Sequence, residues 1–309
     1  MFLIKNFYII FLMDRLYKRE TLIRTICFMS FFVGINVICT FLTTVLPLVG
    51  LLLIIFLPLT SAIVEITCKD RWFPIYAFAT IGLSIAVSLS SIDFTIFYVV
   101  PSIFTGYIFG LFYKLGIPKI FTVFVASFVQ TILSFAFIPL LELITGANLF
   151  DVFIKIFRIS DRFWFDSTVL LVFFSIALIQ TILSFIVVEN ELKKFGTKFE
   201  PRFSEKNISI YLTLLCSGFT FVFSLFYLPL SFLFLGFSYY FLTFLIIYQI
   251  KDSNKVLWFI DGLCVLIGMV VYAALNKYLS NGRDFALFAT IPALISIVSM
   301  AHSFLKKSE

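Results

Sequence analysis

The stretch Thr43–Ser61, TTVLPLVGLLLIIFLPLTS, constrains the fold more than any other part of this chain, because it carries no charged residue. Several further runs exceed the roughly 18 apolar residues that are typical of a membrane helix. Only 13% of all residues are charged, against about 25% in ordinary globular domains. The sequence therefore predicts a membrane protein, with Pro47–Gly50 as the turn between the first two spans and Pro58 inside the second.

Apolar runs alternate with short polar connections along the whole chain. This pattern predicts an all-α fold, a polytopic transmembrane helical bundle of about ten spans. Each span is expected to be helical, because the lipid interior offers no hydrogen-bond partner to an unpaired backbone group. The predicted spans are 26–46, 48–68, 73–91, 94–113, 118–141, 167–188, 208–226, 229–249, 256–276 and 285–304.

The distribution of basic residues predicts the orientation. With a cytoplasmic N-terminus, seventeen of the 23 Lys and Arg residues fall in cytoplasmic segments and five in outer segments, with Lys5 unassigned. Basic residues are retained on the cytoplasmic side of membrane proteins. We therefore expect a multi-pass cell-membrane protein with both termini in the cytoplasm. The net charge of +6 is explained in the same way and does not indicate a nucleic-acid partner.

Composition divides the chain into four segments. Residues 1–25 are expected to be cytoplasmic or interfacial: the first thirteen are apolar but too few to span, so either they lie in the interface or the protein starts at Met13. A six-span module follows at 26–188, then a cytoplasmic linker loop at 189–207 and a four-span module at 208–309. The outer connection 142–166 has the pattern of an amphipathic helix, which would either close the bundle or cover an outward-facing pocket.

Polar side chains within apolar spans are the candidate ligand-binding residues, since they are costly in lipid. Asn36, Gln130 and Gln180 lie mid-span, the two glutamines in a repeated QTILSF motif that arises either from chance or codon bias or from an internal repeat. An amide side chain either bridges helices or binds a neutral polar solute. Asp93, at an outer turn, either orients a cationic group or is simply solvated.

Small residues four apart predict close helix packing. Ser30 and Gly34 form such a pair in the first span, and Gly106 and Gly110 form one in the fourth.

Two acidic residues near cytoplasmic span ends, Glu65 and Asp261, are expected to be structural or interfacial. Glu65 lies four residues before Lys69, a favourable spacing for a helical ion pair.

Several catalytic patterns are absent from the sequence. The single histidine, His302, belongs to no HExxH motif, and there is no P-loop and no GxSxG motif. We therefore expect no enzymatic activity, no ATP hydrolysis by this chain, no cofactor and no metal site. The cysteines form no CxxC pair, which argues against a disulfide framework or a zinc site; they are Cys27, Cys39, Cys68, Cys216 and Cys264.

Four segments resemble one family. LPLVG at Leu46–Gly50, FLPLTSAIVEITCKDRW at Phe56–Trp72, ELKKFGTKFEPRF at Glu191–Phe203 and the residues Ile260–Gly262 are similar to the YybS-like, or DUF2232, family of membrane proteins of Gram-positive bacteria. The resemblance covers the chain from about Arg24 onwards.

The first six spans of that family resemble the substrate-binding S components of energy-coupling factor transporters. The resemblance implies a six-helix bundle that holds a vitamin or a metal ion near its outer face and works with a separate energy-coupling membrane subunit and ATPases. An Ala-x-x-x-Ala pair in the first helix of S components contacts that subunit. Ser30 and Gly34 stand in the corresponding place here, so the Ala pair is missing, and the four additional spans are a second departure.

These patterns lead to two hypotheses. The first is an integral membrane protein that binds or transports a small solute without its own ATPase, with Asn36, Gln130 and Gln180 in the pocket and 142–166 as its cover. The alternative is a membrane scaffold or regulatory protein that recruits cytosolic partners through 189–207.

Overall fold

The computed structural model describes residues 22–89, 92, 95–146, 151, 155, 162–194, 202–251, 255–275 and 283–308. Within this part of the chain the fold is all-helical, with ten α-helices and no strand. Seven helical runs are long and apolar enough to cross a membrane. These are α2 (Leu22–Val45), α7 (Lys119–Thr145), α9 (Arg162–Lys194), α10 (Glu205–Phe226), α11 (Leu228–Lys251), α12 (Lys255–Leu275), and the 3-10 helix η5 (Arg283–Ala289) with α13 (Thr290–Ser308).

Three further helices coincide with predicted spans but are shorter or less completely described. They are α3 (Pro47–Thr67), α4 (Phe73–Val87) and α6 (Val100–Leu115), the last continuing from the π-helix η3 (Thr95–Val99). A 3-10 turn, η1 (Asp70–Trp72), joins α3 to α4. Every predicted span thus contains a helix, while length and composition support seven membrane crossings.

The chain divides into two compact units. The first contains α2 to α7 together with α9 from Phe173 onwards. The second contains the beginning of α9, up to Val172, and α10 to α13.

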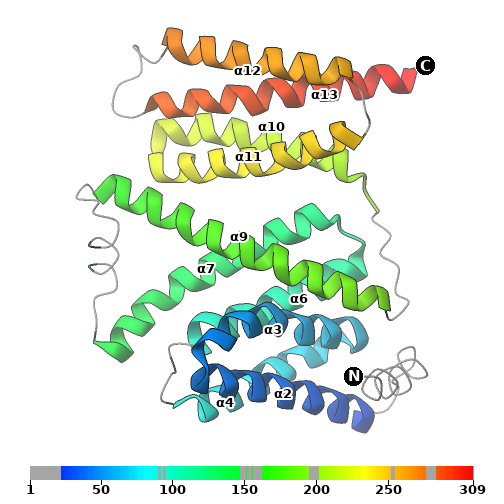
Figure 1. Cartoon of the computed structure of the whole chain (residues 1–309), viewed down its shortest axis with the longest axis vertical. Coiled ribbons are helices and arrows are strands. Elements are labelled where there is room, and N and C mark those ends of the chain that lie inside the picture. The colour runs from blue at the N-terminus through cyan, green and yellow to red at the C-terminus, as the bar shows by residue number, and fades with distance from the viewer. Residues whose placement is uncertain are drawn as a thin grey trace. The chain divides into compact units, whose positions relative to one another are not determined.

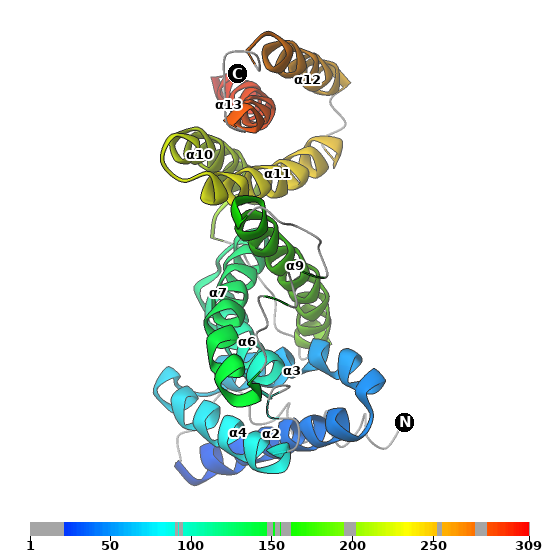
Figure 2. The same ribbon diagram turned by 90° about the vertical axis from the view of Figure 1, so that its left-hand side faces the viewer.

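In the first unit, α3 lies between α2 and α6 (Figure 1), and α2 also packs against α4 (Figure 2). The core of these contacts is aromatic and aliphatic, with Phe32, Tyr76 and Ile103 almost completely buried. In the second unit, α10 pairs with α11 and α12 lies along α13 (Figure 1).

The turn predicted at Pro47–Gly50 is wrong, because these residues form the first turn of α3. Only Leu46 separates α2 from α3. Proline is well suited to a first helical turn, where its missing N–H has no intrahelical partner in any case. Pro58 lies inside α3, as the sequence predicts.

The helices bury small hydroxyl side chains and expose large apolar ones. On α10, hydroxyls at successive turns are buried and donate to backbone carbonyl oxygens three or four residues earlier. Large side chains such as Phe78, Phe226 and Phe259 are 79%, 81% and 73% exposed. This distribution suits a lipid environment, where polar groups need partners within the protein and apolar groups do not need burial. The hydroxyls of α10 belong to Ser209, Thr213, Ser217, Thr220 and Ser224.

Part of the predicted linker loop 189–207 is helical. Glu189–Lys194 completes α9, and Glu205 begins α10. Lys193 pairs with Glu189 at 2.8 Å, four residues apart, and such a pair stabilises a helix. The amphipathic helix predicted at 142–166 lies mostly outside the described residues, as does most of the N-terminal segment 1–25.

Candidate functional site

A ring of three buried side chains joins α2, α3 and α4. The Asn36 amide nitrogen donates to the Tyr76 hydroxyl at 2.7 Å, and Tyr76 donates to the Thr60 hydroxyl oxygen at 3.2 Å. Thr60 donates in turn to the Asn36 side-chain oxygen at 2.8 Å. A buried amide without hydrogen bonds costs several kcal/mol, roughly 2–7 depending on the reference state, so the ring explains how α2 tolerates an asparagine.

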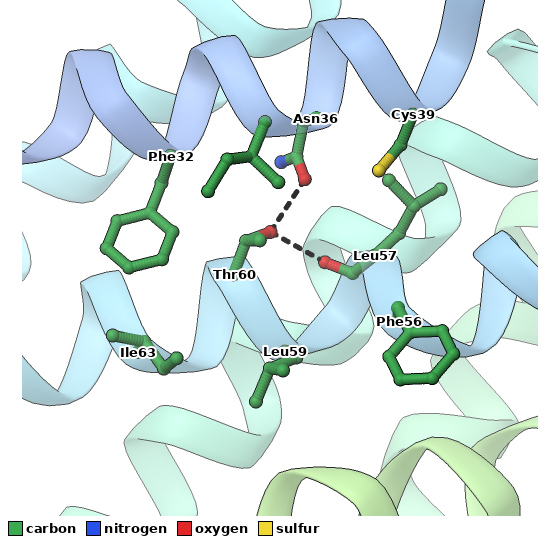
Figure 3. Close-up of a pocket in the computed structure, with 9 residues that line it drawn as sticks. Phe32, Asn36, Cys39, Phe56, Leu57, Leu59, Thr60 and Ile63 are labelled. Carbon is green, nitrogen blue, oxygen red and sulfur yellow. Dashed lines mark hydrogen bonds between the residues drawn. The ribbon is translucent and has the colours of Figure 1, made fainter. Parts of the chain in front are cut away.

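The ring leaves part of the Asn36 amide free. An amide nitrogen carries two hydrogens, and the described residues provide one partner, Tyr76. The single hydroxyl hydrogen of Thr60 is shared between Asn36 and the Leu57 carbonyl oxygen, each 2.8 Å away (Figure 3). Asn36 therefore retains one donor hydrogen and some acceptor capacity.

A cavity of about 180 Å³ lies beside this ring, between α2 and α3 (Figure 3). Asn36 and Thr60 supply its oxygen and nitrogen side-chain atoms, and Cys39 adds a thiol. The rest of the lining is apolar and includes Phe32, Phe56, Leu57 and Ile63. The cavity thus combines an apolar wall with one amide and one hydroxyl, and its side chains carry no charge.

The two glutamines form a separate cluster between α7 and α9. The Gln130 amide nitrogen donates to the Gln180 oxygen at 2.6 Å. The Gln130 oxygen accepts from Thr181 at 3.2 Å and from Thr105 of α6 at 3.3 Å. Both functional groups of Gln130 are thus occupied by neighbouring helices. Of the three predicted pocket residues, Asn36 lines the cavity between α2 and α3, and Gln130 and Gln180 do not. Asp93 lies outside the described residues.

The predicted packing pairs differ in their surroundings. A Cβ on Gly106 would lie 2.3 Å from the Pro58 carbonyl oxygen, and one on Gly110 would lie 2.6 Å from the Glu65 Cβ. These two glycines let α6 approach α3 closely. Ser30 is exposed, and a Cβ on Gly34 would meet no described atom within 4 Å. The Ser30–Gly34 pair therefore makes no close helix contact within the described residues.

An ionic cluster lies at the end of α3. The Lys114 ammonium group of α6 donates to Glu65 at 2.8 Å and to Asp70 at 2.6 Å. The expected pair of Glu65 with Lys69 is replaced, because α3 ends at Thr67 and Lys69 is not on the helix. The nearby ammonium group of Lys114 holds the pKa of the Asp70 carboxyl below its usual range.

Sequence reasoning missed Tyr76, although a signal for it exists. Tyr76, Thr80, Ser84 and Ser88 are spaced four residues apart along α4 and its C-cap, and all four are buried. This spacing places them on one face of a helix. A polar stripe on an apolar helix indicates the face that turns toward the other helices, and Tyr76 is its largest member.

The described residues contain no group of three or more His, Cys, Asp or Glu side chains that could hold a metal ion. Comparison with known proteins found no match to a family model, to a curated protein or to a solved structure. The resemblance to the YybS-like family remains a prediction from the sequence.

Proposed function

We propose that this multi-pass membrane protein binds a small neutral solute in the cavity between α2 and α3 and moves it across the cell membrane. The observation that carries the proposal is the cavity of about 180 Å³ beside a buried amide, Asn36, that keeps a donor hydrogen free. An asparagine used only to join helices would not need to line a cavity.

The lining restricts the class of solute. An apolar wall with no charged side chain favours a neutral molecule, since an ion would lose its hydration without gaining a counter-charge. A cavity of about 150 Å³ holds a benzene-sized molecule, and pockets for drug-sized ligands begin at about 300 Å³. The solute is therefore a compact apolar body with one hydroxyl, carbonyl or amide group.

A separate partner supplies the energy for transport in this proposal. The chain contains no P-loop, and the resemblance to S components implies an energy-coupling membrane subunit with ATPases. We also propose that α3, α4 and the run from η3 into α6 cross the membrane, which makes ten spans. Continuous helices over Pro47–Thr67 and Thr95–Leu115 support this count.

Binding can be tested with 4-fluoroacetophenone, which has a carbonyl acceptor, and fluorobenzene, which has none. We expect ¹⁹F NMR to show tighter binding of the ketone to the detergent-purified protein. Replacing Asn36 by Leu should remove this preference. Cys39→Phe should abolish the binding of both probes by filling the cavity, whereas Cys39→Ser should leave binding unchanged.

Equal binding to wild type and Cys39→Phe would contradict the assignment of the cavity. Absence of probe binding to wild type, together with absence of any co-purifying small molecule in native mass spectrometry, would contradict solute binding altogether. The scaffold alternative rests on 189–207, and residues 195–201 of that segment lie outside the described residues.

A further inference from the structure

The carboxyl group of Glu65 is buried where α3 and α6 pack closely together. Glu65 is 1% exposed and lies in the last turn of α3. A Cβ on Gly110 of α6 would lie 2.6 Å from the Glu65 Cβ and 2.7 Å from its Cγ. The Cβ and Cγ of Glu65 are therefore packed tightly against α6.

The carboxyl is only half satisfied. Its Oε1 atom accepts from Lys114 at 2.8 Å, whereas Oε2 is buried and has no hydrogen-bond partner among the described residues. Leaving a buried acceptor unpaired is unfavourable, and more so when the group is charged. A charged Glu65 is thus an expensive state of this site.

Two further features make negative charge unfavourable here. Lys114 is shared among Glu65, Asp70 and the Cys68 carbonyl oxygen, so one ammonium group serves two carboxylates. Glu65 also lies at the C-terminal end of α3, where the helix dipole is negative and disfavours anions. The cluster therefore lacks one positive charge.

We infer that Glu65 is a proton-binding site. A proton from water adds to Oε2 and forms an O–H bond, which makes the carboxyl neutral and leaves one carboxylate, Asp70, paired with Lys114. The neutral group can also donate a hydrogen bond to a backbone carbonyl, which a carboxylate cannot do. This inference concerns a different site from the cavity and does not depend on solute binding.

The neighbouring groups are compatible with this assignment. The charged or titratable side chains that act on Glu65 are Lys114 and Tyr107 of α6 and Asp70 of η1. Lys114 opposes proton uptake, while burial, Asp70 and the helix end favour it. A small cation such as Na⁺ would supply the same charge, so the experiment needs to distinguish proton binding from sodium binding.

The test is the pH dependence of thermal unfolding of the full chain in detergent, with NaCl or choline chloride. Because the folded state binds a proton that the unfolded Glu65 releases at these pH values, stability rises as the pH falls from about 8 to about 5, where ordinary carboxyls stay ionised. We expect the Tm of wild type to rise by about 2–4 °C, equally in both salts. Glu65→Gln should lose this rise.

Glu189→Gln is the matched control. Glu189 accepts from both Lys119 and Lys193, so its charge is fully compensated and the wild-type response should persist. Lys114→Met, which removes the opposing cation, should shift the response to higher pH. Infrared difference spectra between the two pH values should show a protonated carboxyl band that Glu65→Gln lacks.

Three results would overturn the inference. The first is a Glu65→Gln variant that keeps both the pH response and the infrared band. The second is a wild-type response that NaCl suppresses and choline chloride does not, which would assign the site to a sodium ion. The third applies if Glu65→Gln does not fold. It is a Lys114→Met variant whose Tm rises over the same pH range as that of wild type.

Discussion

Two glycines set the distance between α3 and α6. Gly106 faces the Pro58 carbonyl and Ser61, and Gly110 faces Ala62 and Glu65. Lipid provides no hydrophobic force between helices, so such close backbone contacts supply much of the association energy. The contact also packs α6 against the Cβ and Cγ of Glu65, which links this packing to the chemistry of the site.

A single added methyl group should disrupt this contact. Gly110→Ala places a Cβ 2.6 Å from that of Glu65, and we expect it to lower the free energy of unfolding by about 1–3 kcal/mol. Gly34→Ala is the control, because its Cβ would meet no described atom within 4 Å. Denaturant unfolding in mixed micelles measures both variants, and equal effects would contradict the proposed role of Gly110.

Asp70 should make a small contribution to the stability of the folded state, and this contribution should be lost in acid. The Lys114 ammonium lowers the pKa of the Asp70 carboxyl in the folded state. Its stabilisation is therefore complete above the unfolded pKa of about 4 and is lost as the pH falls through the folded pKa. Asp70→Asn should reduce stability at neutral pH by less than about 1 kcal/mol, because the carboxyl is 63% exposed. The difference in Tm between wild type and variant should vanish in strong acid; a difference that persists there would contradict the pairing.

At the scale of elements, polar side chains hold pairs of helices together at separate points. Asn36, Thr60 and Tyr76 join α2, α3 and α4. Gln130 and Gln180 join α7 and α9, and in the second unit Gln249 of α11 donates to Ser299 of α13 at 2.7 Å. Each contact brings together residues that are far apart in the sequence, so each specifies which helices are neighbours.

The two glutamines should behave as an energetically coupled pair. Gln130→Leu leaves Gln180 without its donor, and we expect a loss of about 1–3 kcal/mol in unfolding free energy. The double variant, with Gln180→Leu, should cost less than the sum of the single variants. Binding of the fluorinated probes should be unchanged in all three. Additive losses of unfolding free energy would contradict the contact. Loss of probe binding would indicate that these residues belong to the binding site.

For the whole molecule, the number of crossings decides the location of the C-terminus. With a cytoplasmic N-terminus, ten spans place the C-terminus in the cytoplasm, whereas seven place it outside. We expect a C-terminal GFP fusion to fluoresce and an alkaline phosphatase fusion to be inactive. The opposite pattern would mean an odd number of crossings, in which case at least one of α3, α4 and α6 does not span.

Periodic and compositional signals predicted the elements well. Apolar runs located a helix in every predicted span, because lipid permits almost no other backbone structure. Short-range details were harder to predict. Pro47 begins a helix and does not form a turn, because a helix start and a turn both accept proline. Residues 189–194 extend α9 although five of the six are polar, because Leu192 stays buried and Lys193 pairs with Glu189 along the helix.

By itself, the sequence determined that this chain is helical and resides in a membrane. It also singled out two of the buried amides, Asn36 and Gln130, but not Gln249. The tertiary structure alone decided their partners: Gln130 binds Gln180, while Asn36 binds Thr60 and Tyr76 beside a cavity. The tertiary structure also decided that the ion-pair partner of Glu65 is Lys114 and not Lys69. The physical reason is that helix formation depends on local polarity, whereas hydrogen bonds and ion pairs between helices depend on which faces meet, and that information is not local.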